Sequence, residues 1–184
     1  MMLSLAKKTI FAGMFLFSFF GLWGCGGGGS STSSTPTPVI AFSPASTGGA
    51  TSDLLTLSLN IAASTASLAV IDLNGTNLNT SSAYGISADL KFDSTWMTFS
   101  SFTPDATNAT TAIVLPLETD PNTLVIGLYK VKNPSGHLGT FRFNLNPTGK
   151  TAPLVFVSSS TYIGTLGSVL ASPALKGFGG TLNN

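Results

Sequence analysis

Along much of the chain, apolar and polar residues alternate, a pattern typical of strands that bury one face and expose the other to water. The clearest alternating runs are Leu55–Ile61, Tyr84–Phe92, Ile113–Leu117 and Phe141–Leu145. Leu124–Val131 and Leu154–Val157 are apolar at most positions, which predicts central strands covered on both faces. The expected turns are Asn74-Gly75, Asp120–Asn122, Asn133–Gly136 and Asn146–Gly149. Short strands separated by such turns predict an all-β sandwich or barrel.

The N-terminal segment has the pattern of an export signal. Lys7 and Lys8 precede the apolar run Thr9–Trp23, which is 15 residues long. A membrane-spanning helix needs about 20 apolar residues, whereas a signal peptide needs fewer. The run ends in Leu22-Trp23-Gly24-Cys25, which resembles the lipobox of bacterial lipoproteins, although Trp23 stands where a small residue is usual. Cys25 is therefore the expected lipidation site; a plain signal peptide or an uncleaved anchor is the alternative.

This pattern divides the chain into three parts. Residues 1–24 are the expected lipoprotein signal peptide, residues 25–38 an acylated Cys with a Gly/Ser/Thr/Pro linker, and residues 39–184 the folded domain. Two or more acyl chains hold a protein stably in a membrane. Gly26 stands where lipoproteins retained in the inner membrane carry Asp. We therefore expect export and a lipid anchor in the cell envelope, with the outer membrane or cell surface as its location.

Charge and composition exclude several classes of function. Charged residues make up 8% of the chain and the net charge is +1, so no basic surface for nucleic acid is expected. A single Cys and a single His exclude Cys/His zinc clusters and leave a serine nucleophile without a suitable base, because His137 lies in a Gly-rich turn. We expect a protein that is not an enzyme, with no catalytic residue, metal or cofactor.

Two blocks of sequence resemble cohesin domains. The first is Ala83–Asp93 followed by Trp96–Phe99, and the second is Ser135–Leu145. The long connection Ala62–Ser82, and Ser94 where Pro is common, depart from the family pattern. The resemblance implies an antiparallel jelly-roll sandwich of about nine strands. It also implies a non-catalytic module that binds another protein, either one bearing a dockerin or a partner in adhesion.

The resemblance further implies that the strands containing Gly85–Lys91 and Thr140–Asn144 belong to one sheet whose outer surface meets the partner. Strand alternation predicts which side chains point outward from these two strands. The expected partner-binding residues are Ser87, Asp89, Lys91, Thr140, Arg142 and Asn144.

Two other functions stay open. A surface carbohydrate-binding module would bind a polysaccharide through exposed aromatic rings. Trp96 is the candidate contact because it has the opposite parity from Met97 and Phe99, whereas Tyr84 has the parity of the core. The third possibility is a structural envelope lipoprotein with no soluble partner.

Replacement of the lipidation site tests the anchor. We expect Cys25→Ser to give an unacylated precursor, because this substitution removes the only thiol of the chain. Metabolic labelling with a radioactive fatty acid checks this, with the wild-type chain as the positive control. Label that persists in Cys25→Ser would contradict the anchor, and fractionation solely with the inner membrane would contradict the expected location.

Overall fold

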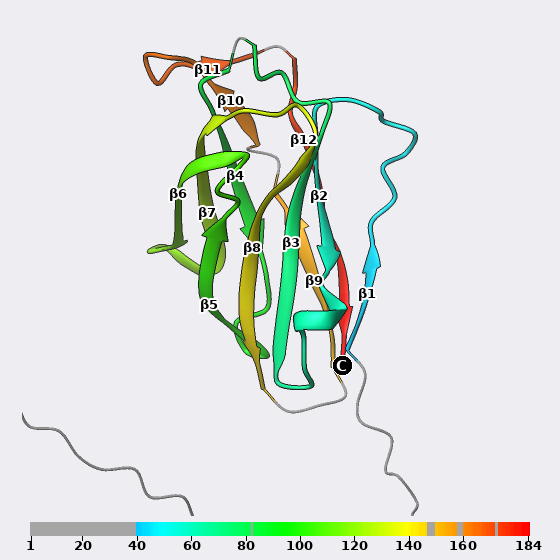
Figure 1. The fold of residues 1–184 in the computed structure, drawn as a ribbon. Coiled ribbons are helices and arrows are strands. Elements are labelled where there is room, and N and C mark those ends of the chain that lie inside the picture. The colour runs from blue at the N-terminus through cyan, green and yellow to red at the C-terminus, as the bar shows by residue number, and fades with distance from the viewer. Residues whose placement is uncertain (1–39, 82, 147–149, 158–159, 172) are drawn as a thin grey trace, which may run out of the picture. The chain divides into compact units, whose positions relative to one another are not determined.

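The computed structural model describes residues 40–81, 83–146, 150–157, 160–171 and 173–184. These residues form two β-sheets packed face to face, with one short 3-10 turn at Ile61–Ala63 (Figure 1). Within this part of the chain, we find no helix long and apolar enough to cross a membrane. The all-β sandwich expected from the alternating pattern is confirmed.

The larger sheet has eight strands, which branch around β4. Its order is β1-β13-β9-β4-β10-β11, and β4 also pairs with β7, which in turn pairs with β6. The strands are β1 (Ala41–Pro44), β4 (Gly85–Lys91), β6 (Ala109–Leu117), β7 (Asp120–Val131), β9 (Thr151–Phe156), β10 (Thr161–Ile163), β11 (Val169–Leu170) and β13 (Gly180–Asn183). Two strands pair with the same edge of β4. Strand β10 pairs with residues Gly85–Ser87, and β9 pairs with Leu90 and Lys91.

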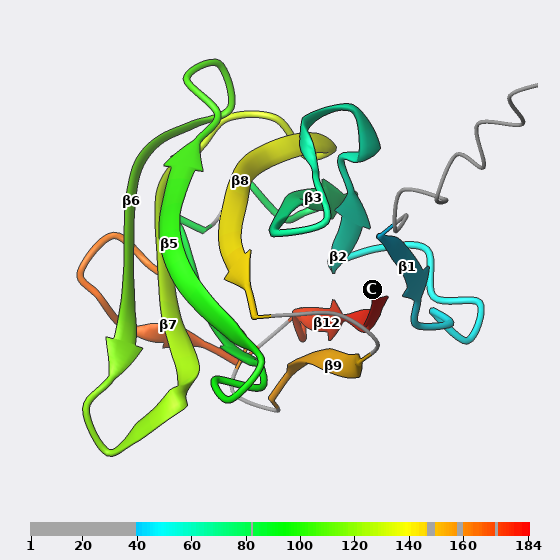
Figure 2. The ribbon, with the colours of Figure 1, turned by 90° about the horizontal axis from the view of Figure 1, so that it is seen from below.

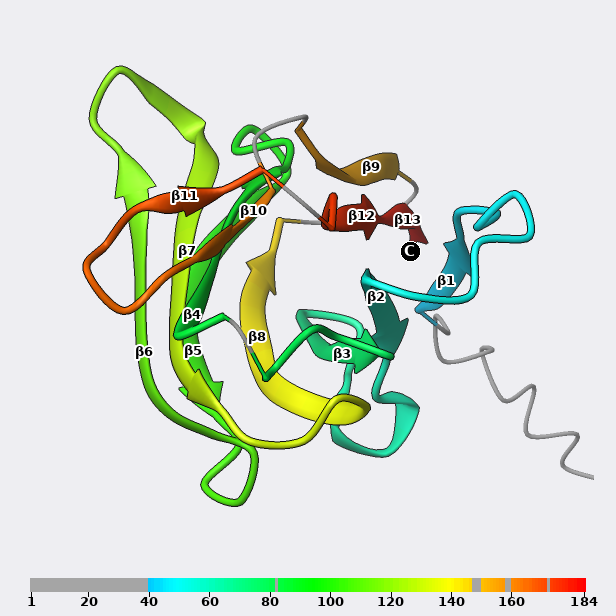
Figure 3. The same cartoon turned by 90° about the horizontal axis from the view of Figure 1, so that it is seen from above.

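The smaller sheet has five strands in the order β12-β2-β3-β8-β5. They are β2 (Leu54–Leu59), β3 (Leu68–Thr76), β5 (Met97–Pro104), β8 (Gly136–Leu145) and β12 (Lys176–Phe178). Views from the two ends show β6 and β7 in one layer, and β8 and β3 in the other (Figures 2 and 3). The described residues form thirteen strands, some of them only two to four residues long, instead of the nine expected.

Aromatic side chains of β8 lie at the centre of the core. Phe141 and Phe143 are completely buried, and they stack with ring centroids 6.2 Å apart. Phe102 of β5 lies 4.6 Å from Phe141, and Phe92, just after β4, lies 5.4 Å from Phe143. These rings therefore join β8 to its neighbour β5 and to the opposite sheet. Arg142, between the two buried rings, is exposed, as alternation predicts.

Most of the predicted strands are present, but three details were wrong. Asn74-Gly75 is not a turn, because both residues lie in β3, where a shift in pairing with β8 follows Leu73. Asp120–Asn122 is not a turn either, because these residues begin β7. All but the first residue of the expected turn Asn146–Gly149 lie outside the described residues. The strands β7 and β9 are not covered on both faces: Val125 is half-buried, and Val155 is exposed. An apolar outer face of the larger sheet is thus open to solvent.

Substitutions at two neighbouring positions of β8 test the inward and outward assignment. We expect Phe143→Ala to lower the free energy of unfolding by about 3–5 kcal/mol, because it removes a buried ring and leaves a cavity. Its control, Arg142→Ala on the exposed side, should change this free energy by less than about 0.5 kcal/mol. Equal losses in urea denaturation would contradict the assignment.

Candidate functional site

The six residues predicted to form one partner-binding face do not share a face. Ser87, Asp89 and Lys91 lie on β4 in the larger sheet, whereas Thr140, Arg142 and Asn144 lie on β8 in the smaller one. Each set alternates with buried residues and points away from the core, as expected. The assumption that both strands belong to one sheet was wrong, because they face each other across the core with their outer surfaces on opposite sides.

Trp96 is not an exposed carbohydrate contact. Its side chain is 0% exposed, and the neighbouring Met97 is equally buried. Trp96 lies in the turn before β5, where its backbone N–H donates to the carbonyl oxygen of Asp93. Strand alternation does not extend into a turn, so the parity of Trp96 gave a wrong prediction.

Exposed apolar side chains gather on the larger sheet. Among the described residues, seven of the eight large hydrophobic residues that are exposed belong to this sheet or to segments next to its strands. They are Tyr84, Ile113, Leu115, Leu117, Val155, Leu166 and Val169. Ile113 and Leu115 of β6 are 52% and 60% exposed. Ile113 and Leu115 lie next to each other on the outer side of β6, and exposed apolar patches mark interaction sites in soluble domains.

Strand pairing arranges the outward residues in rows. Residues that are paired across antiparallel strands point to the same side of a sheet. One row joins Ile113, Gly127 and Ser87, and the next joins Leu115, Val125 and Asp89. We call the surface made by these six residues with Tyr129 and Lys91 the β6–β7–β4 face. The smaller sheet covers the opposite side of these strands, and its strand β5 borders the face beside Ile113 and Leu115.

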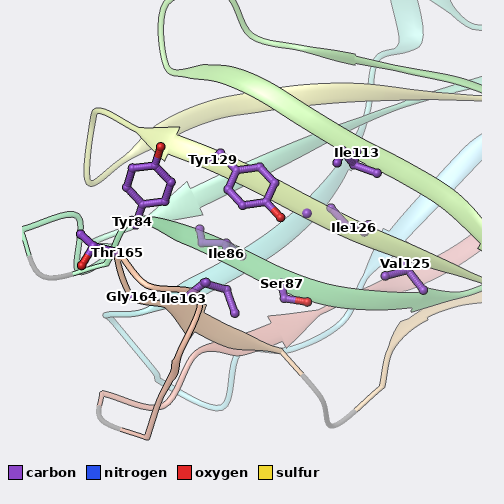
Figure 4. A pocket seen from close by; sticks show the side chains of 12 residues that line it. Tyr84, Ile86, Ser87, Ile113, Val125, Ile126, Tyr129, Ile163, Gly164 and Thr165 are labelled. Carbon is purple, nitrogen blue, oxygen red and sulfur yellow. The ribbon is translucent and has the colours of Figure 1, made fainter.

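A groove of about 370 Å³ lies at one end of this face (Figure 4). Tyr84 and Tyr129 flank it, with ring centroids 6.3 Å apart and ring planes inclined at 58°. Ile163 and Gly164, at the end of β10, line another side, and Ile113 contributes from β6. The groove thus combines apolar walls with the hydroxyl groups of two tyrosines. This composition suits an apolar side chain of a partner that has polar groups around it.

Backbone hydrogen bonds hold Tyr84 in place. Its N–H donates to the carbonyl oxygen of Ile163 at 2.7 Å, and its own carbonyl oxygen accepts from the N–H of Lys130 at 2.9 Å. Lys130 has φ 54°, a left-handed conformation that is uncommon for a residue with a side chain. Tyr84 precedes β4 and is 39% exposed, so its expected place in the core was wrong.

Charged groups lie at the opposite end of the face. Lys91 Nζ is 3.3 Å from Asp120 Oδ2. The hydroxyl group of Thr123 donates to the same oxygen and lowers the pKa of the Asp120 carboxyl group, and the N–H of Asn122 and the charge of Lys91 lower it further. Asp120 is therefore ionised and paired with Lys91. The row formed by Ile113, Gly127 and Ser87 contains no charged side chain. The face is apolar at its centre and polar at this end.

The described residues hold no group of three or more His, Cys, Asp or Glu side chains that could bind a metal. Cys25, the expected lipidation site, lies outside the described residues.

The search for solved structures finds cohesin modules. One, from a family 33 glycoside hydrolase of Clostridium perfringens, is 10% identical over 80% of this chain and 96% of that one, with a TM-score of 0.49. Type II cohesin A11 of Bacteroides cellulosolvens is 14% identical over 71% and 96% of the two chains, with a TM-score of 0.48. The OlpC cohesin of Clostridium thermocellum, solved in complex with a dockerin, is 13% identical over 60% and 81%, with a TM-score of 0.48. No protein-family model matches the sequence, nor does any curated protein.

The same substitution at two glycines tests whether the face has free space. A Cβ on Gly127 would meet its nearest neighbour, Tyr129 Cε2, at 3.5 Å, whereas a Cβ on Gly139 of β8 would overlap Phe102 Cζ and lie 2.7 Å from Thr103 O. We expect Gly127→Ala to be neutral or to stabilise by up to about 1 kcal/mol. Gly139→Ala should destabilise by about 1–3 kcal/mol, because it overpacks the sheet. Equal changes in the free energy of unfolding would contradict this difference.

Proposed function

We propose that this chain is a non-catalytic module that binds another protein through the β6–β7–β4 face. One observation carries the proposal: Ile113 and Leu115 expose more than half of their surface, and Ile113 also lines the groove flanked by Tyr84 and Tyr129. Burial of apolar surface contributes about 25 cal/mol per Å², so a partner that covers this face gains binding free energy. The tyrosines supply the large, rigid contacts common in protein interfaces.

The proposed partner is a protein of the dockerin type. The sequence blocks around Gly85–Lys91 and Gly136–Leu145 resemble cohesins, and Ile113, Leu115 and Val125 form an exposed apolar area on the larger sheet in the described part of the chain. Such an area suits contact with a protein partner. The expected binding residues Ser87 and Lys91 lie on the proposed face, whereas Arg142 and its neighbours on β8 lie on the other sheet.

Carbohydrate binding is the second candidate, because the rings of Tyr84 and Tyr129 flank the groove. A sugar stacks on flat, exposed aromatic surface. The two ring planes meet at 58° and form no common platform. This inclination favours the side chain of a protein partner over a polysaccharide.

We also propose that the module is displayed on the outer membrane or cell surface by acyl chains on Cys25. The Gly/Ser/Thr/Pro segment after Cys25 has the composition of a flexible linker. Such a linker would give the module freedom to meet a partner at some distance from the lipid.

Two matched substitutions test the binding face. Leu115→Asp and Thr98→Asp each place a carboxylate on an exposed position of a strand at the edge of a sheet, on β6 and β5 respectively. We expect Leu115→Asp to weaken partner binding at least tenfold, about 1.4 kcal/mol, because the charge would lose water in the interface. Thr98→Asp should leave the affinity unchanged.

The measurement is isothermal titration with calcium-loaded dockerin modules from the same organism, with a panel of insoluble polysaccharides as the second ligand. Tight binding of a dockerin that Leu115→Asp weakens and Thr98→Asp does not would support the proposal. An equal loss of affinity in both variants would show that Leu115 is not part of the binding site. Binding of a polysaccharide but of no dockerin would favour the carbohydrate-binding alternative.

A further inference from the structure

Strand β6 has the longest regular free edge among the described residues. In this part of the chain it pairs only with β7, and it lies at the outer border of the larger sheet (Figures 1 and 2). The edge strands β1, β11 and β12 are only two to four residues long. Strand β5, the other long edge strand, has an irregularity in its pairing between Phe99 and Ser101. Strand β6 keeps a constant register from Thr111 to Pro116, so its free backbone groups are evenly spaced for pairing with another strand.

Hydrogen bonds between β4 and β7 show to which side each residue of β7 directs its backbone groups. The N–H of Lys130 donates to the carbonyl oxygen of Tyr84 at 2.9 Å. At the other end of the pair, the N–H of Phe92 donates to the carbonyl oxygen of Asn122 at 2.8 Å. Successive residues of a central antiparallel strand bond alternately to its two neighbours. Even-numbered residues of β7 therefore bond to β4, and odd-numbered residues bond to β6.

The same alternation identifies the groups of β6 that have no partner strand. Ile113 and Leu115 are paired with odd-numbered residues of β7, so their backbone groups are used within the sheet. The backbone groups of Ala112, Val114 and Pro116 point to the free edge instead. Proline is tolerated in an edge strand where its missing N–H would face solvent, and Pro116 agrees with this assignment.

The free edge of β6 also lacks the charged residues that commonly prevent edge strands from pairing. Strand β6 contains no charged residue, and its outward side chains Ile113 and Leu115 are the exposed apolar residues described above. A groove of about 440 Å³ between β5 and β6 leaves space along this edge. Another uncharged strand can therefore approach β6 without burying a charge.

We propose that β6 pairs, antiparallel and about a two-fold axis at Ile113, with β6 of a second copy of this chain. An antiparallel edge is complementary to itself, because the second copy offers the same donors and acceptors in reverse order. With the axis at Ile113, Ala112 of each copy lies opposite Val114 of the other, and each such pair exchanges two backbone hydrogen bonds. An axis at Val114 would place Ala112 opposite Pro116, which has no N–H to donate.

Charges near the two ends of β6 favour a second copy as the occupant of this edge. The axis places Glu118, just after β6, beside Asn108 of the second copy. The N–H of Lys132 donates to the carbonyl oxygen of Asn108, so Lys132 of that copy lies about 10 Å away, at two strand spacings, within reach of two long side chains. Glu118 and Lys132 are exposed, and neither forms an ion pair with another described residue. The two-fold axis thus brings opposite charges together twice.

Pairing of this kind joins the larger sheets of two copies into one continuous sheet. The β6–β7–β4 faces of both copies then lie side by side on the same outer surface. The dimer goes beyond the proposed binding of a partner and does not rest on it, because it uses the edge of β6 and not the outer surface of the sheet.

An introduced thiol tests the position of the axis. In the full chain carrying Cys25→Ser, Ile113→Cys supplies the only thiol and places it opposite its copy, at a spacing that a disulfide can bridge. We expect mild oxidation to give a disulfide-linked dimer on a non-reducing gel. Arg142→Cys in the same background is the matched control, because it is exposed on the smaller sheet, and it should stay monomeric. Equal cross-linking of the two variants, or none with Ile113→Cys, would overturn the proposed pairing.

A second measurement determines the oligomeric state without a cross-link. Ile113→Lys places two like charges at the axis, and we expect it to raise the dissociation constant of the dimer at least tenfold, whereas Thr98→Lys on β5 should leave this constant unchanged. The measurement is sedimentation of the full chain in a mild detergent, with no dockerin or polysaccharide present. A wild-type chain that is monomeric at about 100 μM, or a dimer that Ile113→Lys leaves intact, would overturn the proposal. Failure to bind a dockerin would overturn the proposed function and leave this dimer standing.

Discussion

The structure depends on the burial of inward-facing side chains between two sheets that share one core. Each central strand gives alternate residues to that core, and Phe141 and Phe143 of β8 contact rings of neighbouring segments from both sides of it. Once these positions are buried, strand geometry fixes which side chains point outward. The proposed binding face is a direct consequence, because among the described residues the smaller sheet covers only the inner side of β4, β6 and β7.

The chemistry of the two outer surfaces follows from what each sheet carries at its outward positions. On β8 these are Thr140, Arg142 and Asn144, which suit contact with water. On β6 and β7 they include Ile113, Leu115 and Val125, which suit contact with another apolar surface. Only 8% of the residues in the chain are charged, and a partner of the proposed kind would bury this apolar surface.

Much of the fold could be predicted from the sequence, because period-two alternation is a local signal. It located β4 and the second half of β8 and assigned their inward and outward residues correctly. Which strands share a sheet is decided by contacts between distant segments, which alternation does not report, so the joint face of β4 and β8 was wrong. The prediction that Trp96 is exposed was wrong for a related reason, since Trp96 lies in a turn, where strand alternation does not apply. The apolar run Leu124–Val131 of β7 predicts burial on both faces, whereas in the structure one of these faces is the exposed apolar surface.

Amide hydrogen exchange with and without a bound dockerin-type protein tests whether the β6–β7–β4 face meets the partner. We expect slower exchange on binding in β6 and at Gly127 of β7, with exchange in β5 and at Arg142 of β8 unchanged. Slower exchange confined to β5 and β8 would place the partner on the smaller sheet and overturn the proposed binding face.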